Sequence, residues 1–301
     1  MKRIFISLLF LAGCAGGPLE DAQPLDKPTI TETAIKGGET LALSRWVPEG
    51  PPRAVILALH GFGDYGPSTF EAAARYWAER GILVYAYDQR GFGRNSSRGK
   101  WPGAVRLIAD FTEIAKSLRA RHDDLPLLAL GHSMGGGVAL AAVGAGADVD
   151  GLILAAPAVW GGENLNIAYR TAAWTGAFIA PEKRWSGKGV VKIQATDNIE
   201  ALRALGRDEV ILRNPSSREF LGLIRLMDAA VNAAPQVAVP TLFLYGAKDQ
   251  VTPKRPLMAT YAALPGEKQL KLYPEGWHLL FRDLQAEVVY RDVADWVETF
   301  E

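Results

Sequence analysis

The sequence predicts an α/β protein in which helices cover both faces of a mostly parallel β-sheet. Three observations over the 301 residues support this class. Short apolar runs of strand length alternate with longer segments of helical periodicity, which is typical of parallel sheets. A Gly-x-Ser-x-Gly sequence connects one such strand to one such helix. The alternation then stops over residues 157–236, which predicts a helical insertion.

The first elements are predicted as an antiparallel edge of the sheet. Residues 29–36 and 40–47 alternate apolar and polar side chains around Gly37-Gly38, as in a β-hairpin. Further apolar runs predict strands at 54–59, 82–87, 125–130, 151–155, 240–245 and 269–273. Helical periodicity lies between them at 69–80, 104–121, 135–144, 256–264 and 283–300. Loops after parallel strands meet at one edge of the sheet, where open α/β sheets bind ligands.

The insertion at 157–236 is predicted to be a helical cap with one amphipathic helix over 217–231. We expect Asp197 and Asn198 to cap helices there. For the large apolar residues of the cap two interpretations stay open. Most are expected to pack the cap onto the core, and some to line an acyl pocket or enter a lipid interface. These residues are Trp160, Trp174, Phe178, Trp185, Phe220 and Met227.

The segment Gly131-His132-Ser133-Met134-Gly135 predicts a nucleophile elbow between strand 125–130 and helix 135–144. So tight a turn strains the backbone of Ser133 and leaves no room for side chains at Gly131 and Gly135. The helix N-terminus behind the turn favours developing negative charge. Ser133 is therefore the candidate nucleophile.

A serine nucleophile needs a base, and the chain has four histidines. His122 lies in a charged run that predicts a solvated helix end. His132 lies within the elbow and is expected to point away from Ser133, and His60 is expected to shape a loop. His278, in a loop after strand 269–273, is left as the candidate base.

The candidate acid and one candidate oxyanion-hole residue each lie in a loop that follows a predicted strand. Asp249 comes just after strand 240–245, and the order Ser133, Asp249, His278 is Ser-acid-His. Two backbone N–H groups are needed to hold an oxyanion. Met134 follows the nucleophile, and Phe62 lies in the glycine-rich loop after strand 54–59, so we expect these two residues to supply them.

These segments resemble the monoacylglycerol lipase and lysophospholipase branch of the α/β-hydrolases, which also includes serine-aminopeptidase-like proteins. The resemblance covers residues 30–301 and implies an α/β-hydrolase fold that cleaves acylglycerol- or lysophospholipid-type esters. Two departures stand out: an extra residue within Arg94-Asn95-Ser96, and an apolar Leu279-Leu280-Phe281 after the histidine. The segments that carry the resemblance are His60-Gly61-Phe62-Gly63, Asp88-Gln89-Arg90-Gly91-Phe92-Gly93, Gly131-His132-Ser133-Met134-Gly135-Gly136, Tyr245-Gly246-Ala247-Lys248-Asp249 and Gly276-Trp277-His278.

Two other functions stay open at this point. An amidase or aminopeptidase on the same triad would need a carboxylate in the cap to hold a substrate amine, with Glu163, Glu182 and Glu200 as candidates. A non-catalytic lipoprotein could use the same fold for binding, although every triad residue type is present.

The N-terminus resembles a bacterial lipoprotein signal. A basic start and an apolar run at 4–12 too short to span a bilayer precede Leu11-Ala12-Gly13-Cys14. We expect a signal peptide at 1–13, a lipid anchor on Cys14, a tether at 14–28 and the hydrolase domain at 29–301. The cysteine is the only one in the chain, which excludes intrachain disulfides. Ala15 would follow it, which favours the periplasmic side of the outer membrane within a bacterial cell envelope.

Composition argues against other classes of protein. Thirty-three basic and 33 acidic residues give no net charge and no basic run for nucleic acid. We find no His/Cys cluster for a metal and no phosphate-binding glycine loop. We therefore expect neither metal nor cofactor, an ester as substrate and the membrane as partner through the anchor, and the oligomeric state is left open.

Overall fold

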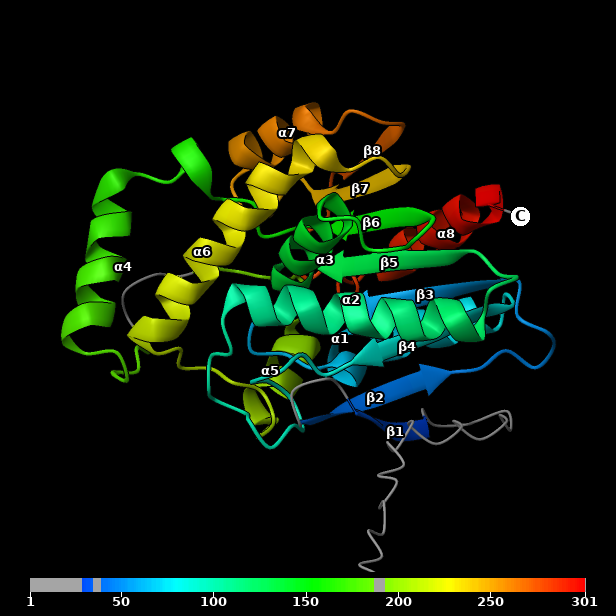
Figure 1. Cartoon of the computed structure of the whole chain (residues 1–301), viewed down its shortest axis with the longest axis horizontal. Helices are drawn as coiled ribbons and strands as arrows, with labels where there is room; N and C mark the ends of the chain where they lie inside the picture. The colour runs from blue at the N-terminus through cyan, green and yellow to red at the C-terminus, as the bar shows by residue number, and fades with distance from the viewer. Residues whose placement is uncertain (1–28, 35–38, 187–192, 301) are drawn as a thin grey trace, which may run out of the picture.

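The computed structural model describes residues 29–34, 39–186 and 193–300. The predicted signal peptide, the lipidation site Cys14 and the tether lie outside these described residues. The strands form one eight-stranded sheet in the order β1-β2-β4-β3-β5-β6-β7-β8. β1 pairs with β2 and β2 with β4 in antiparallel fashion, and the other neighbours are parallel (Figure 1). The predicted mostly parallel sheet with an antiparallel edge is confirmed.

Six of the eight strands coincide with predicted ones to within one residue at each end, and β5 differs more. The predicted end of the first strand, at residues 35–36, lies outside the described residues. β5 begins later than predicted, at Leu127, because Pro126 has no N–H to donate to a strand partner. It also runs on to His132, since Gly131 and His132 pair with β6. The strands are β1 (Thr29–Ala34), β2 (Thr40–Trp46), β3 (Ala54–Leu59), β4 (Ile82–Tyr87), β5 (Leu127–His132), β6 (Gly151–Ala155), β7 (Thr241–Gly246) and β8 (Lys268–Tyr273).

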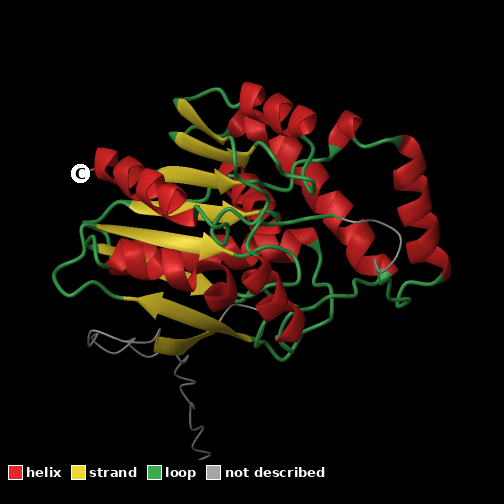
Figure 2. Ribbon diagram, turned by 180° about the vertical axis from the view of Figure 1, so that it is seen from behind, coloured by secondary structure: helices red, strands yellow, loops and turns green. Residues whose placement is uncertain are grey.

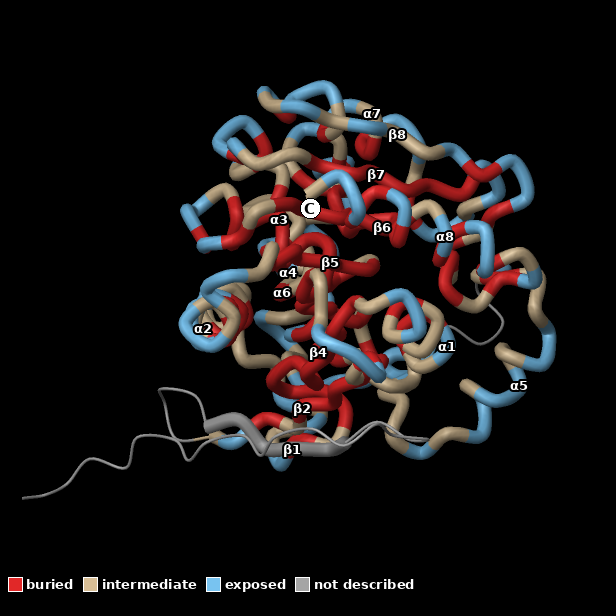
Figure 3. The backbone as a smooth tube through the Cα atoms, turned by 90° about the vertical axis from the view of Figure 1, so that its right-hand side faces the viewer, coloured by how far each residue is buried: buried red, intermediate tan, exposed pale blue. Residues whose placement is uncertain are grey.

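Helices cover both faces of the sheet, as predicted. α2, α3 and α7 contribute to one apolar cluster, and α1 and α8 to the other (Figure 3). α1 begins three residues before its predicted start, because the carboxylate of Asp88 accepts the N–H of Gly66 at 3.0 Å. These helices are α1 (Gly66–Ala78), α2 (Ala104–Arg121), α3 (Met134–Gly144), α7 (Lys254–Ala263) and α8 (Ala286–Val297), the last followed by a 3₁₀ turn, η3 (Glu298–Phe300).

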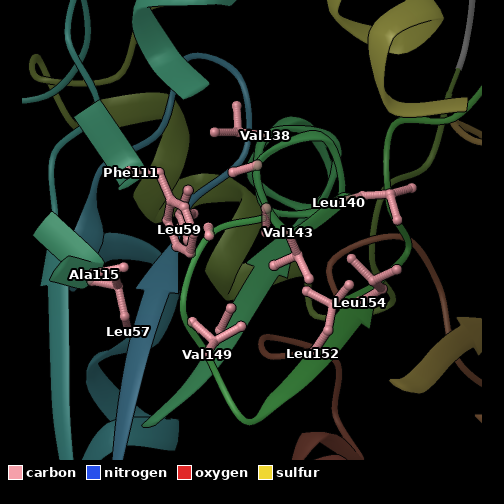
Figure 4. Packing of buried hydrophobic residues seen from close by; sticks show 14 of the residues in the cluster. Leu57, Leu59, Phe111, Ala115, Val138, Leu140, Val143, Val149, Leu152 and Leu154 are labelled. Atoms are coloured by element: carbon pink, nitrogen blue, oxygen red, sulfur yellow. The ribbon is translucent and has the colours of Figure 1, made fainter. Parts of the chain in front are cut away.

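The core beneath α3 holds the nucleophile turn in place. The two leucines of β3, Leu57 and Leu59, are buried and pack with Phe111 and Ala115 of α2 and Val138 of α3 (Figure 4). A strand buried on both faces between two helix layers has little freedom to move. This packing therefore holds the turn between β5 and α3 in a fixed position.

The segment between β6 and β7 contributes no strand to the sheet within its described residues. It holds a 3₁₀ turn, η1 (Gly162–Asn164), and α4 (Ile167–Ile179), α5 (Ile199–Arg207) and α6 (Ser217–Ala233), followed by a second 3₁₀ turn, η2 (Ala234–Gln236). α6 packs along α3, and α4 packs on α6 away from the sheet (Figures 1 and 2). Ser216 and Glu219 form a capping box at the start of α6. Asn198 caps α5, accepting the N–H of Ala201 at 3.0 Å, as predicted.

The expectation that most large apolar residues of the cap pack against the core is wrong. Four of the six are exposed: Trp174, Phe178, Trp185 and Phe220. For Trp174 and Phe178 the reason lies in the layering, because α6 separates α4 from the core and no residue of α4 is buried. Trp185 lies after the end of α4, and Phe220 is an exposed residue of α6 itself. Packing on the core falls instead to Leu226 and Ala230 of α6, which are fully buried.

Among the helices that the structure describes, none combines the length and the apolar character needed to cross a bilayer.

Candidate active site

Ser133 is the single residue between β5 and α3. Its backbone has φ 51° and ψ −117°, a conformation that residues other than glycine rarely adopt. Its N–H donates to the carbonyl of Ala155 at 3.0 Å, and its carbonyl accepts the N–H of Ala158 at 2.8 Å. A Cβ at Gly131 would collide with the carbonyl of Gly135, and one at Gly135 with the carbonyls of Leu59 and His60, at the end of β3. The turn therefore requires both glycines, as the sequence predicts.

The three predicted triad residues meet at the carboxyl edge of the sheet. Nε2 of His278 lies 3.0 Å from Oγ of Ser133, and its Nδ1 lies 2.9 Å from Oδ2 of Asp249. The side chain of His278 is 6% exposed and that of Asp249 is fully buried. The ring is thus held between the hydroxyl and the carboxylate, in the arrangement that serine activation needs.

Asp249 is held by backbone groups of its own loop. Its Oδ1 accepts the N–H groups of Val251 at 2.7 Å and Thr252 at 3.0 Å, which leaves Oδ2 for His278. The loop is joined to the base loop by a hydrogen bond from Lys248 N–H to the carbonyl of Gly276. Asp249 and His278 therefore lie on two loops that are fixed to each other.

The two predicted oxyanion-hole residues border the nucleophile. Met134 is the first residue of α3, where N–H groups have no acceptor within the helix. Phe62 follows Gly61, and a Cβ added to Gly61 would come within 3.3 Å of the Cβ of Ser133. The structure thus brings the loop that carries Phe62 against the nucleophile turn.

His132 contacts the backbone of His278, a contact that sequence reasoning missed. Its Nε2 lies 3.0 Å from the carbonyl oxygen of His278, and the two rings are 5.2 Å apart. Burial, followed by the neighbouring His278, lowers the pKa of His132 to about 3. The ring is therefore neutral, and its Nε2–H donates to that carbonyl. Only its position directly before the nucleophile could have marked it.

The other two histidines stand apart from Ser133. His60 shapes its loop, as predicted: its Nε2 accepts the N–H of Gln89 at 2.8 Å, and burial lowers its pKa. His122 is not the solvated helix end that the sequence predicts. It is half-buried and its Nε2 lies 3.1 Å from the hydroxyl of Tyr85, because the end of α2 folds back onto β4.

The apolar segment after His278 turns inward. Leu280 and Phe281 are buried in the core beside α1 and α8. Arg282 forms an ion pair with Asp64 at 2.6 Å. Asp283 accepts the N–H of Trp277 at 2.7 Å, and burial raises its pKa to about 6. The departure from the family pattern at this point therefore builds the support of the base loop.

The extra residue after β4 is also structural. Asn95 is buried, and its side-chain oxygen accepts the N–H of Ala42 at 2.9 Å. Its amide group donates to the carbonyl of Asp88 at 2.7 Å. The insertion thus joins the loop after β4 to the antiparallel edge of the sheet.

A family described as serine aminopeptidase, S33, matches residues 50–285. The chain belongs to this S33 family. The matched region includes Ser133, Asp249 and His278 and the whole described cap.

Relatives and a solved structure agree with the S33 assignment. A monoacylglycerol lipase of Mycolicibacterium smegmatis is 28% identical over 87% of this chain and 94% of its own length. The human monoglyceride lipase is 25% identical over 93% of this chain and 94% of its own. A soluble variant of the Saccharomyces cerevisiae monoglyceride lipase, solved with a substrate analog, has a TM-score of 0.76 at 21% identity, covering 92% of this chain and 96% of its own. The resemblance to the monoacylglycerol lipase-like branch, the α/β-hydrolase fold and the assignment as a serine ester hydrolase are confirmed.

The cap holds the three carboxylates predicted as candidate ligands for a substrate amine. Glu182 is exposed and forms an ion pair with Arg218 at 2.8 Å. Glu200 is exposed and pairs with Arg203. Glu163 lies in η1. Two of the three carboxylates are thus already paired with arginines of the cap.

Within the described parts of the chain, no three His, Cys, Asp or Glu side chains gather as they would around a metal ion.

Proposed function

We propose that this protein hydrolyses carboxylic esters with an acyl chain, of the acylglycerol or lysophospholipid type, through a covalent acyl-enzyme on Ser133. The observation that carries the proposal is the hydrogen-bonded series from buried Asp249 through His278 to the hydroxyl of Ser133.

The reaction follows from these groups. Oγ of Ser133 attacks the ester carbonyl carbon while Nε2 of His278 takes the hydroxyl proton. The oxyanion is held by the N–H groups of Phe62 and Met134. When the carbon–oxygen bond of the alcohol breaks, His278 gives its proton to the leaving oxygen. Water, deprotonated by the same imidazole, then releases the acid and restores Ser133, while Asp249 stabilises the charged ring throughout.

The choice of substrate rests on the relatives and on the cap. Both relatives are named as lipases of monoacylglycerols. Exposed aromatic side chains of the cap suit a substrate with an acyl chain. An amine substrate would need a free carboxylate, and two of the three candidates, Glu182 and Glu200, are engaged with arginines, which leaves Glu163 for that role.

We also propose that the protein acts while tethered to a membrane by lipid on Cys14, on the periplasmic side of the outer membrane. The support is the Leu-Ala-Gly-Cys sequence after a basic and apolar start. Such an anchor would keep the enzyme beside its lipid substrates.

The test is a chain-length series of p-nitrophenyl esters, from two to sixteen carbons, together with a monoacylglycerol and a lysophospholipid. The full-length protein is compared with Ser133→Ala and with Ser186→Ala, an exposed serine of the cap as matched control. We expect Ser133→Ala to lose roughly 10⁴-fold or more in kcat, and Ser186→Ala to keep full activity.

A fluorophosphonate probe supplies a second readout. It is expected to label the wild type and Ser186→Ala, but not Ser133→Ala. Hydrolysis that survives in folded Ser133→Ala would refute the nucleophile. Activity on aminoacyl anilides alone would support the amidase, and a wild type that neither reacts nor hydrolyses would support a binding module.

A further inference from the structure

A groove of about 920 Å³ lies between α2, α4 and α6, outside the set of residues around Ser133. Its volume falls within the roughly 300–1,000 Å³ that small-molecule pockets occupy. Most of its lining is apolar, and the side chains come from three separate elements: Val105, Ile108, Ala177, Phe178, Leu221 and Ala229. Such a surface suits a hydrocarbon chain.

One residue of this groove also contacts the ring of Phe62. Trp101 lines the groove, and its ring stacks on that of Phe62 with centroids 6.4 Å apart. It also meets the buried ring of Phe92 edge to face at 6.3 Å. Phe62 directly follows Gly61, the residue against Ser133. The indole of Trp101 therefore lies between the ring of Phe62 and the groove.

Contacts from both the core and the cap fix the position of the Trp101 ring. A Cβ at Gly222 of α6 would collide with the indole nitrogen of Trp101, so glycine in mid-helix makes room for the ring. The loop before Trp101 is closed by a hydrogen bond from Gly99 N–H to the carbonyl of Gly91 at 2.8 Å. Arg184 of the cap donates to the carbonyl of Gly99 at 3.0 Å. The ring of Trp101 is thus held by the loop before it and by the cap together.

We propose that Trp101 limits the length of acyl chain that the enzyme accepts, by closing the groove between α2, α4 and α6 to a chain bound at Ser133. The inference rests on the proposed function, because it needs an acyl group on the nucleophile. A chain that runs along Phe62 meets the indole. With the ring removed, the same chain continues into the apolar groove and buries more methylenes there.

The experiment measures kcat/KM for p-nitrophenyl esters of four to sixteen carbons with full-length wild type and Trp101→Ala. We expect the ratio of kcat/KM for the sixteen-carbon to the eight-carbon ester to rise at least tenfold in the variant, as two or more further buried methylenes would give. Trp185→Ala removes a partly exposed tryptophan of the cap that does not line the groove, and is expected to leave the ratio unchanged.

A double variant that fills the groove again tests whether the groove itself gives the gain for long chains. In the double variant Trp101→Ala/Ala177→Trp an indole on α4 occupies the groove, so the gain for long chains should disappear. If Trp101→Ala folds poorly, Trp101→Phe should shift the ratio in the same direction by a smaller factor.

An unchanged ratio in a folded, fluorophosphonate-reactive Trp101→Ala enzyme would overturn the inference, as would a gain that the double variant keeps. The failure of the proposed function looks different: the wild type itself would then neither react with the probe nor cleave any ester of the series.

Discussion

At the scale of single residues, His132 shows how a neutral buried group can act on a base without touching substrate. It lies directly before the nucleophile in sequence and donates to the backbone of His278 at 3.0 Å. In the proposed reaction, protonated His278 must return to the same place in each half-reaction, so a support for its backbone bears on turnover. We therefore propose His132 as a positioning residue.

Replacing His132 tests this role. His132→Phe keeps the ring volume and loses the donor, so we expect kcat to fall about tenfold with KM changed less than about twofold. His132→Gln keeps a donor and should recover most of the loss. Steady-state kinetics of both variants on one ester give the answer, and equal losses in the two would indicate a packing role instead.

Asp283, in the segment after His278, is a buried carboxyl. It is 4% exposed, and burial raises its pKa from 3.8 to about 6. A carboxyl whose pKa is higher in the folded chain binds its proton more tightly when folded. Protonation therefore favours folding, and this contribution to stability grows as the pH falls from about 6 to about 4.

The variant Asp283→Asn should remove this dependence. The amide oxygen can still accept the N–H of Trp277, and no charge is buried. At pH 7.5 we expect the free energy of unfolding to exceed that of the wild type by at most about 3 kcal/mol, at 1.36 kcal/mol per pKa unit. Urea unfolding at several pH values measures the difference, which should vanish below about pH 4. A constant difference across this range would contradict the assignment.

At the scale of elements, the strand–turn–helix from β5 to α3 is the least tolerant part of the fold. Its glycines are needed because backbone carbonyls occupy the space where side chains would stand. The helix that follows is buried along almost its whole length, so it cannot move aside to relieve a clash. The strain at Ser133 is held by this packing.

A pair of glycine variants tests that statement. Gly135→Ala places a methyl group against the carbonyls of Leu59 and His60, and we expect a loss of about 3 kcal/mol or more in the free energy of unfolding. Gly206→Ala, in α5, meets nothing within 4 Å and should gain up to about 1 kcal/mol from helix propensity. Denaturant unfolding compares the two, and a Gly135→Ala protein as stable as wild type would show that the turn can relax.

At the scale of the whole molecule, the sheet and its two helix layers support a cap that meets the core through one main helix. α6 packs along α3, and α4 is carried on the outer side of α6. The segment after residue 193 also joins the base loop, where Leu279 N–H donates to the carbonyl of Ala195 at 2.9 Å. The cap is therefore attached both to the nucleophile helix and to the loop that carries His278.

The proposed anchor is tested on the whole protein in cells. Cys14→Ser removes the thiol that would receive lipid, so we expect the variant to leave the membrane fraction after a high-salt wash while the wild type stays. Specific activity on a soluble short-chain ester should be equal in both, because the site is built from residues 60–278. Retention of Cys14→Ser in membranes would show that another part of the chain binds them.

The sequence predicted the local patterns of the fold and the site, but not all of the packing. The elbow, the order of Ser133, Asp249 and His278 and the alternation of strands and helices are local patterns, and the structure agrees with each. The catalytic roles, the oxyanion residues and the lipid anchor stay proposals with the tests given above. The expected packing of Trp174 and Phe178 on the core was wrong, because no local pattern indicates that α6 stands between α4 and the core.

What the sequence by itself determined is therefore what neighbouring residues impose on one another: two glycines around a strained serine, polar residues after buried strands, and a helical insertion where the alternation stops. Only the tertiary structure decided which distant groups meet. The bond of His132 to the backbone of His278, the burial of Asp283 and the position of Trp101 between Phe62 and Gly222 depend on how the loops fold over the sheet. Such contacts join residues up to 146 positions apart, and packing, which no local pattern encodes, brings them together.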